Sequence, residues 1–250
     1  MDDVQLILLD EVDSTLSEAE RLVEAGHSKR TVICAKSQTG GHGRFGRLWT
    51  SPPGNLYWTL ILPCERHWPV DSGLPFVSGL AVMDCLRATG VSSDLISLKW
   101  PNDALVEGKK ISGILIKSVY ASARGTSGAY ALIGIGINIA TYPKDTFFPA
   151  TSLNALGLDD VDIATMRDEL TAAYLRRLEQ WRSGGFSAIR AECVAKLHGV
   201  GLLQQVAVNR ERTDVIEGIN RGIDENGSLM LEMPSETIRL ISAGDMLGPL

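Results

Sequence analysis

Residues 31–62 read TVICAKSQTGGHGRFGRLWTSPPGNLYWTLIL, and this stretch decides which fold the chain can adopt. It contains a literal G-x-G-x-x-G at 41–46, which in a dinucleotide-binding fold follows a strand and begins a helix. The β-branched, apolar run at 31–37 predicts the strand. No helix is predicted after it, because Pro52 and Pro53 lack backbone donors and a second strand-like run follows. The pattern therefore disfavours a dinucleotide fold and predicts a glycine-rich loop between two strands.

This loop carries groups that suit an anionic ligand with an aromatic part. Glycines expose backbone N–H groups that can cradle an anion. Arg44 and Arg47 offer guanidinium groups for a phosphate or carboxylate, and Trp49 offers a ring for stacking. A solvated surface loop is the alternative interpretation, and the loop alone does not decide between the two.

A second cluster of polar residues lies in LKWPNDALVEGKKISGIL, residues 98–115. Charged residues inside apolar strand-like segments are unusual, because an unpaired buried charge is costly. Asp103 can position a magnesium-bound or hydroxyl-bearing ligand, and Lys110 can neutralise charge that develops on a phosphoryl group. For one of the two lysines, Lys109 or Lys110, a solvated hairpin turn is expected. A third stretch, IGIGINIA at 133–140, places Asn138 after glycines that allow close backbone approach.

The hydrophobic patterning predicts an α+β fold. A buried strand at 5–12 is followed by a helix with a capping box of Thr15 and Glu18, and longer helices are predicted at 72–90 and 162–181. Short turns at 107–110 and 123–128 join strand-like segments, which favours hairpins and an antiparallel sheet. After about residue 198, short strands and polar turns indicate a small β-barrel. The predicted domains are therefore 1–197 and 198–250.

Composition narrows the classes of function. The 250 residues are 44% hydrophobic with a formal net charge of −6, so generic nucleic-acid binding is disfavoured. Four cysteines without C-x-x-C spacing favour free thiols in a reducing compartment rather than zinc or disulfides. No signal peptide or apolar run of about 18 residues is present, which predicts a cytoplasmic protein without a membrane span.

Four stretches in order resemble the catalytic domain of biotin protein ligases: DST, SQTGGHGRFGRLWTSPPGNLY, KWPNDALVEGKKISGIL and GIGINIA. The segment GINRGIDENGSLMLE at 218–232 is similar to the family's small C-terminal SH3-like domain. The resemblance implies a class II aminoacyl-tRNA synthetase-like catalytic fold, with a mixed, largely antiparallel sheet packed with helices. It also implies the ligase-only type, without the N-terminal DNA-binding domain of bifunctional members.

The implied reaction has two steps. Biotin and Mg-ATP form biotinyl-5′-AMP and pyrophosphate, and the activated carbonyl then acylates a lysine of a biotin carboxyl carrier protein. The resemblance thus implies biotin, ATP and Mg²⁺ as ligands, a carrier domain as partner, and no DNA or membrane. A homodimer is one expected assembly, and no metal-ligating residue is assigned.

The resemblance also implies a role for each matching residue. The catalytic group is Arg44, Asp103 and Lys110. The substrate-binding group, chiefly for biotin, is Ser14, Thr15, Gln38, Gly41, His42 and Gly113. The nucleotide-binding group is Arg47, Trp49 and Asn138.

Two residues depart from the family pattern. The usual Gly-Arg-Gly-Arg is Gly-His-Gly-Arg here, so His42 replaces a fixed positive charge with a group that can be neutral near pH 7. The usual Ser-Thr-Asn is Ser-Thr-Leu, so Leu16 removes a polar group from the pocket edge. Two alternatives therefore stay open: a paralogue that activates another carboxylic acid, and a catalytically silent cofactor-binding module.

Overall fold

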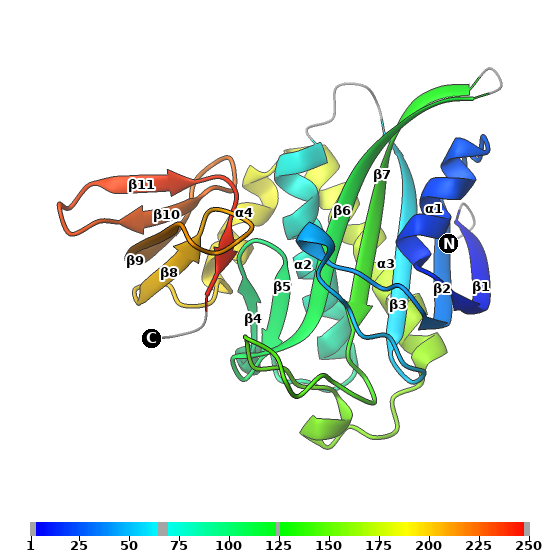
Figure 1. The fold of residues 1–250 in the computed structure, drawn as a ribbon, viewed down its shortest axis with the longest axis horizontal. Helices are drawn as coiled ribbons and strands as arrows, with labels where there is room; N and C mark the ends of the chain where they lie inside the picture. The colour runs from blue at the N-terminus through cyan, green and yellow to red at the C-terminus, as the bar shows by residue number, and fades with distance from the viewer. Residues whose placement is uncertain (1–3, 65–69, 124–125, 248–250) are drawn as a thin grey trace.

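The computed structural model describes residues 4–64, 70–123 and 126–247, which form two β-sheets with helices packed around the first (Figure 1). Within these residues the first sheet has seven strands in the order β1-β2-β3-β7-β6-β5-β4, and only β1 and β2 run parallel. The predicted mixed, largely antiparallel sheet is confirmed. The turn predicted at 123–128 includes residues 124 and 125, which lie outside the described residues. The strands are β1 (Gln5–Val12), β2 (Thr31–Gln38), β3 (Leu56–Cys64), β4 (Ile96–Lys99), β5 (Asp103–Val106), β6 (Lys109–Ala123) and β7 (Thr126–Ile137).

Three helices cover the two faces of this sheet (Figure 1). α2 (Val70–Ala88) and α3 (Ile163–Gly184) pack together over one face, where the larger hydrophobic core lies. α1 (Thr15–Glu24) packs on the other face, against the alternate side chains of β2, β3 and β7. Because α1 has only 10 residues, it covers part of that face and leaves the rest open for a site.

Two local expectations near the N-terminus are wrong. The strand at 5–12 is not buried: β1 is an edge strand, and Leu6 and Leu8 are 44% and 60% exposed. The N-cap of α1 is Ser14 rather than Thr15, because Ser14 has an extended backbone and its hydroxyl accepts a hydrogen bond from the Ser17 N–H. Thr15 therefore lies inside the first turn, and its hydroxyl takes part in the site described below.

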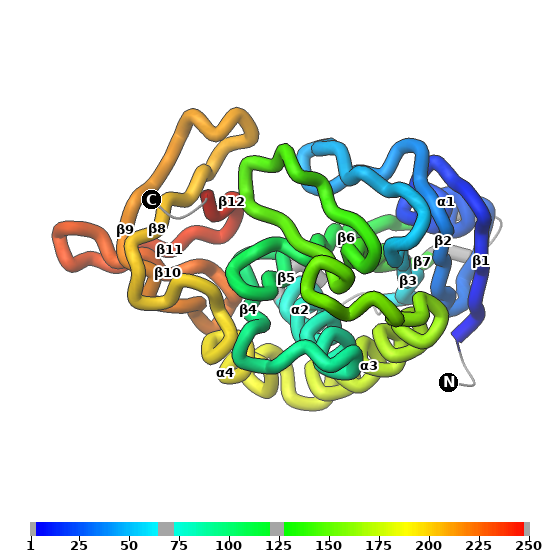
Figure 2. Tube along the Cα trace, turned by 90° about the horizontal axis from the view of Figure 1, so that it is seen from below, coloured from blue at the N-terminus to red at the C-terminus, as the bar shows by residue number. Residues whose placement is uncertain are grey.

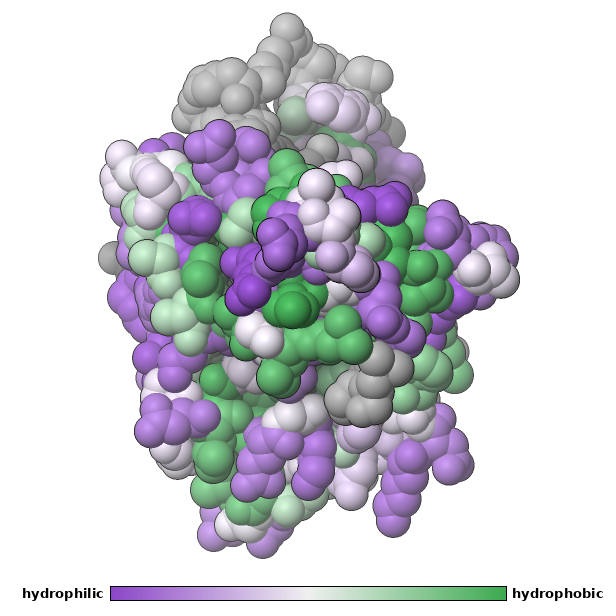
Figure 3. Space-filling model, turned by 90° about the vertical axis from the view of Figure 1, so that its left-hand side faces the viewer, coloured by the Kyte–Doolittle hydropathy of each residue, from purple (hydrophilic) through white to green (hydrophobic). Residues whose placement is uncertain are grey.

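The second sheet is small and antiparallel, with the strand order β11-β10-β9-β8-β12. Its outward face mixes apolar and polar side chains (Figure 3). Leu203, Ile238 and Leu240 of this sheet are each about half exposed. The predicted small C-terminal β module is confirmed, whereas the boundary at residue 198 stays a prediction. The strands are β8 (Leu203–Ala207), β9 (Val215–Ile223), β10 (Leu229–Glu232), β11 (Ile238–Ile241) and β12 (Asp245–Met246).

The last helix, α4 (Ser187–Ala195), ties the second sheet to the first. Arg190 on α4 donates hydrogen bonds to the carbonyl oxygens of Ile223 and Asp224, at 2.6 and 2.9 Å. Among the described residues, no helix is both long and apolar enough to span a bilayer.

Candidate active site

A pocket of about 460 Å³ opens on the α1 face of the first sheet. Its walls come from the start of α1, from the glycine-rich loop at 39–55 and from the segment at 141–150 that follows β7. These loops, the β8–β9 turn and β12 lie along one side of the molecule (Figure 2). Arg212 from that turn and Asp245 from β12 also line the pocket, so both sheets contribute to it.

Glycines on two central strands make the floor of the pocket. Gly136 on β7 and Gly113 on β6 are paired across the sheet, and both face the ring of Trp49. A Cβ atom on Gly136 would lie 2.6 Å from the indole, and one on Gly113 would lie 2.9 Å from it. The indole of Trp49 therefore lies flat over the strands because these positions lack side chains.

A chain of hydrogen bonds holds the end of the pocket nearest α1. The side-chain oxygen of Gln38 accepts from the Thr15 N–H at 2.8 Å and from the Thr15 hydroxyl at 3.1 Å. The hydroxyl of Thr59 donates to that of Thr15 at 2.9 Å, and the Gln38 amide donates to Ser51 at 2.8 Å. Ser14 lines the same end. This end can offer both donors and acceptors to a small polar head group.

The glycine-rich loop folds back on itself and does not begin an α-helix. A single 3-10 turn (Arg44–Gly46) is followed by extended backbone and then β3, which confirms that the motif is not a dinucleotide fingerprint. Gly41 lies behind the pocket lining, where a Cβ would be 2.5 Å from the Ser51 hydroxyl. His42 is exposed and lines the pocket, and its Nδ1 lies 3.2 Å from the Gly40 carbonyl oxygen.

At the opposite end, one buried carboxylate lies between two lysines. Asp103 Oδ1 is 2.6 Å from Lys110 Nζ, and Lys99 Nζ donates to Asp103 Oδ2 at 3.1 Å. Burial would raise the pKa of Asp103, but the charges of Lys110 and Lys99 and hydrogen bonds from both outweigh it and hold that pKa at about 2. Lys110 also lies 5.3 Å from the ring centroid of Trp49. Lys109 is half exposed, and its Nζ lies 4.0 Å from Glu107 Oε2. Lys109 is therefore the lysine that lies in the solvated hairpin turn, as expected for one of the two.

The two loop arginines meet the second sheet at the mouth of the pocket. Arg44 Nη1 donates to the Gly244 carbonyl oxygen at 2.8 Å and to Asp245 Oδ1 at 3.1 Å, and Arg47 donates to Asp245 Oδ2. Burial is the main influence on the pKa of Arg44 and lowers it, against the raising effects of Asp245 and Asp103. The guanidinium of Arg44 is thus turned inward, towards the same pocket as Lys110.

Asn138 stands where β7 ends and the segment at 141–150 begins. It is 3% exposed, and its amide donates to the Thr151 carbonyl oxygen at 3.0 Å. Phe148, further along this segment, lies over Lys99 with 4.6 Å between the ammonium and the ring centroid. Asn138 therefore fixes a segment that closes one side of the pocket.

The structure brings the predicted site residues together in this one pocket, except Gly41, which supports the loop from behind. Their individual roles stay predictions. Sequence reasoning gave no role to four charged residues that line the pocket: Lys99, Asp145, Arg212 and Asp245. Lys99 belongs to the charged cluster already noted at 98–115, whereas Arg212 and Asp245 carry no local signal.

Comparisons with known proteins agree with this geometry. Residues 9–138 match the Biotin/lipoate A/B protein ligase family, and residues 204–247 match the Biotin protein ligase C terminal domain. A biotin--[acetyl-CoA-carboxylase] ligase of Paracoccus denitrificans is 33% identical over 91% of this chain and 94% of its own length. A bifunctional ligase/repressor of Bacillus subtilis (strain 168) is 31% identical over 97% of this chain and 74% of its own length.

Among solved structures, the biotin protein ligase from Aquifex aeolicus in complex with biotin and ATP superposes with a TM-score of 0.81. It is 28% identical, and the match covers 97% of both chains. The fold and the ligase class expected from the sequence are confirmed by these matches. The chain belongs to the biotin/lipoate A/B protein ligase family.

Proposed function

We propose that this protein is an ATP-dependent biotin protein ligase, which adenylates biotin and transfers it to a lysine of a biotin carboxyl carrier protein. One observation carries the proposal: a single pocket has a hydrogen-bonding end at Thr15 and Gln38 and a cationic end at Lys110 and Arg44. The names of the relatives and the complex of the Aquifex aeolicus protein with biotin and ATP support the choice of substrates.

In the first step, a carboxylate oxygen attacks the α-phosphorus of ATP. A bond forms between this oxygen and the α-phosphorus. The bond from the α-phosphorus to the oxygen that bridges to the β-phosphorus breaks, and pyrophosphate leaves with the electron pair of that bond. Negative charge builds up on the α-phosphate and on the leaving group, so fixed cations at those places lower the barrier. Lys110, oriented by Asp103, is the cation beside the reacting carboxyl group, and Arg44 with Arg47 supplies the phosphate side.

In the second step, a lysine amine attacks the carbonyl carbon of the mixed anhydride. The carbon–oxygen bond to the phosphate breaks, AMP leaves, and the nitrogen loses a proton to give the amide. The mixed anhydride is open to hydrolysis, so water must be kept away from it. The glycine-rich loop and the segment at 141–150 both line the pocket and serve this purpose.

Magnesium enters this proposal as part of the substrate Mg-ATP. The described residues contain no group of three His, Cys, Asp or Glu side chains that could hold a metal. The buried carboxylates of Asp103 and Asp245 are already paired with cations. Magnesium is commonly held by nucleotide phosphates with one or two carboxylates, so a dedicated site is not required.

Biotin-dependent exchange between ATP and pyrophosphate, with magnesium and purified protein, tests the proposal. Exchange that requires biotin is the expected result. Bound ATP without exchange would contradict it and favour a catalytically silent module. A panel of other carboxylic acids belongs in the same assay, because Leu16 replaces a polar residue and lines the pocket at 7% exposure. Exchange with another acid and not with biotin would identify a paralogue.

The remaining expectations belong to the same proposal. The carrier domain is the acyl acceptor, and the homodimer stays a prediction that sedimentation of the purified chain tests. The exposed edge of β1, with Leu6 and Leu8, is one surface available for such an assembly. A cytoplasmic location is supported by the four cysteines, all of which are free thiols.

A further inference from the structure

One carboxylate from the second sheet contacts both arginines of the glycine-rich loop. Asp245 Oδ1 lies 3.1 Å from Arg44 Nη1, and Asp245 Oδ2 pairs with Arg47. Arg212 approaches the same carboxylate at 3.7 Å. The side chain of Asp245 is only 9% exposed, so these ion pairs are screened less than pairs at the surface.

The backbone that carries this carboxylate is fixed. Asp245 pairs with Ala207 across β12 and β8, and the Leu247 N–H donates to the Gln205 carbonyl oxygen at 2.9 Å. The preceding Gly244 has no room for a side chain, since a Cβ there would lie 2.8 Å from the Ala207 carbonyl oxygen. Asp245 is therefore held at one place by the second sheet.

In the loop that carries the arginines, the described backbone hydrogen bonds of residues 42–48 stay within the loop itself. Gly43 and Gly46 give its backbone freedom, and Phe45 adopts a left-handed conformation with a φ of 58°. Its short turn is closed by bonds such as Gly43 N–H to the Arg47 carbonyl oxygen at 2.8 Å. Because the carboxylate is fixed and the loop is short of contacts, the carboxylate sets the position of the arginines, and not the reverse.

The contacts leave the arginines able to bind an anion. Among the described residues, Arg44 makes its hydrogen bonds through Nη1 alone, and Arg47 makes its hydrogen bond through Nη2 alone. A guanidinium has five N–H donors, so most of them stay available to a phosphate group. Asp245 thus binds one nitrogen of each arginine and leaves the other N–H donors of each guanidinium for a ligand.

We propose that Asp245 is a positioning residue: it holds Arg44 and Arg47 over the pocket, so that the second sheet keeps the glycine-rich loop closed on the adenylate. The effect on catalysis rests on the proposed function. The effect on the loop does not, because the ion pairs exist without any ligand.

The test compares Asp245→Asn with Glu225→Gln, which removes an exposed carboxylate from the β9–β10 turn of the same sheet. Hydrogen exchange without ligand is measured first, at the Gly43 and Trp49 amides that close the loop. We expect exchange about tenfold faster in Asp245→Asn and unchanged in Glu225→Gln. Arg47→Met, at a half-exposed position, breaks the same ion pair from the loop side and should also speed exchange.

Kinetics then separate positioning from a merely structural role. In Asp245→Asn we expect the KM for ATP and the rate of adenylate release to rise about tenfold, while the KM for biotin stays near that of the parent. Asp245→Glu, which keeps the carboxylate, should show a smaller rise in the KM for ATP and in the rate of adenylate release than Asp245→Asn. Asp245→Asn combined with Arg47→Met should speed loop exchange by less than the product of the two single effects, because the pair between Asp245 and Arg47 is lost in both variants.

Three results would overturn the proposal. Loop exchange equal to the parent in both Asp245→Asn and Arg47→Met would show that the ion pairs do not hold the loop. A lower KM for ATP in Asp245→Asn would show that the carboxylate competes with the phosphates. Equal increases in the KM for ATP and in the KM for biotin would indicate a general structural defect. A parent without biotin-dependent exchange would instead refute the proposed function, and the loop measurement would remain decisive for Asp245.

Discussion

Asp103 determines the electrostatics of the pocket at the scale of single residues. Its carboxylate separates Lys99 and Lys110, which would otherwise repel each other, and only 8% of its side chain is exposed. A buried carboxylate that accepts from two ammonium groups stays ionised at all ordinary pH values, because its pKa is about 2. The two lysines and the carboxylate together carry one net positive charge, which suits a phosphate group.

Asp103→Asn should destabilise the protein in a pH-dependent way. The pKa of Asp103 is lower in the folded chain than the ordinary value, so its contribution is present above about pH 4 and is lost as the pH falls towards 2. A shift of this size corresponds to about 2 kcal/mol of stability at neutral pH. Denaturant unfolding of parent and variant from pH 7 to pH 3 measures it. A stability difference that does not shrink below pH 4 would contradict this role.

Lys110→Ala should abolish adenylation while leaving the fold intact. Lys110 is 26% exposed and lines the pocket. In the proposed reaction its charge stabilises the negative charge that develops in the transition state. Loss of such a group typically costs about 10²- to 10³-fold in rate. Lys109→Ala is the matched control, because the adjacent side chain is half exposed and contacts only Glu107 among the described residues. Biotin-dependent exchange between ATP and pyrophosphate is measured for both variants. Similar exchange rates in the two would refute the assignment of Lys110.

The sequence located Lys110 and Asp103 but assigned no role to their second partner, Lys99. Lys110 and Asp103 are seven residues apart, across one hairpin, so their proximity follows from the local pattern. Lys99 pairs with the same carboxylate from the preceding strand, and the charged cluster at 98–115 does not by itself show which of its lysines reaches that carboxylate. Which lysine turns inward is decided by the register and by the bulge between Ala104 and Leu105.

At the scale of elements, one face of β7 contributes to the hydrophobic core and the other face forms part of the pocket floor. Its odd-numbered residues Ile133 and Ile135 pack into the core under α2, while Gly134 and Gly136 face the pocket. The alternation of a strand thus places bulk on one face and space on the other. The stretch IGIGINIA predicted close approach at these glycines, and the ring of Trp49 is what approaches Gly136.

Gly136→Ala should displace Trp49 and weaken ATP binding. The new methyl group would lie 2.6 Å from the indole, and the strand beneath cannot move because it pairs with β3 and β6. We expect a red shift of tryptophan emission and a several-fold higher KM for ATP. Gly134→Ala is the control for the fluorescence, since its methyl group would lie 3.4 Å from Leu16 and away from Trp49. Unchanged emission in Gly136→Ala would contradict the packing described here.

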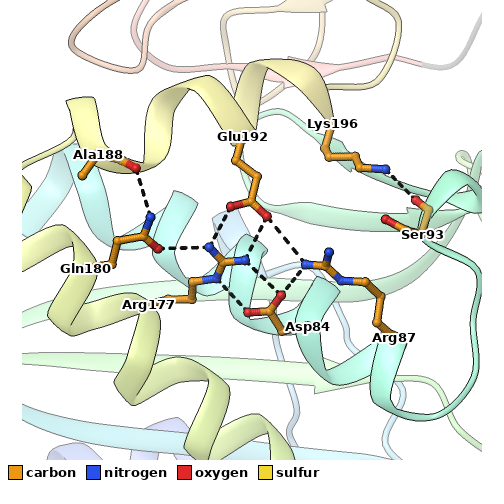
Figure 4. A network of polar contacts seen from close by, with 8 residues as sticks. All are labelled: Asp84, Arg87, Ser93, Arg177, Gln180, Ala188, Glu192 and Lys196. Atoms are coloured by element: carbon orange, nitrogen blue, oxygen red, sulfur yellow. Dashed lines mark hydrogen bonds and ion pairs between the residues drawn. The ribbon is translucent and has the colours of Figure 1, made fainter.

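An ion-pair network fixes three helices to one another (Figure 4). Arg177 on α3 bonds to both Asp84 on α2 and Glu192 on α4, at distances of 2.7–3.0 Å. Arg87 joins the same carboxylates from α2. Because α4 also holds β9 through Arg190, the network orients the helix on which the second sheet rests.

Arg177→Met should cost about 1–3 kcal/mol of stability, between the values for exposed and buried pairs. Its side chain is 14% exposed, and its removal leaves Arg87 as the one cationic partner of Asp84 among the described residues. Arg176→Met changes an exposed neighbour on the same helix and should have little effect. Thermal unfolding of the two variants provides the comparison. Equal melting temperatures would mean that the network contributes nothing measurable.

Burial of elements was harder to predict than their existence. The run QLILLDEV predicts a strand, and β1 is a strand, yet its position at the sheet edge leaves Leu6 and Leu8 exposed. An apolar run shows that a strand can be buried, but it does not show whether another element will pack against the strand. Likewise Thr15 and Glu18 fit a capping box, but Ser14 is the N-cap, because its backbone is still extended and its hydroxyl accepts from the Ser17 N–H.

At the scale of the whole molecule, the pocket depends on contacts between residues far apart in the chain. Arg44 and Asp245 are 201 residues apart, and no periodicity or motif connects them. The sequence predicted a C-terminal β module of the right size, but its docking is a property of surfaces that form only after both sheets have folded. That is why Asp245 and Arg212 were missed as site residues.

Trp100 belongs to the hydrophobic core that joins the two sheets. It is 2% exposed in the turn between β4 and β5, and its indole N–H donates to the Gly227 carbonyl oxygen at 3.0 Å. A Cβ on Gly244, next to Asp245, would lie 3.6 Å from its ring. The indole therefore packs beneath the strand that presents the carboxylate. Coupling of this kind predicts that the parent unfolds in a single transition.

Trp100→Ala should uncouple the two sheets, because it removes a buried ring whose loss typically costs about 3–5 kcal/mol. Native-state hydrogen exchange measures the opening free energy of β9 and β7 separately. We expect equal values in the parent and a lower value for β9 in the variant. Trp100→Phe keeps most of the packing, loses one hydrogen bond worth about 1 kcal/mol, and should keep the two values equal. Equal values in Trp100→Ala would show that the sheets are coupled elsewhere, for example by the ion pairs of Asp245 and by the hydrogen bonds from Arg190 to backbone carbonyl oxygens.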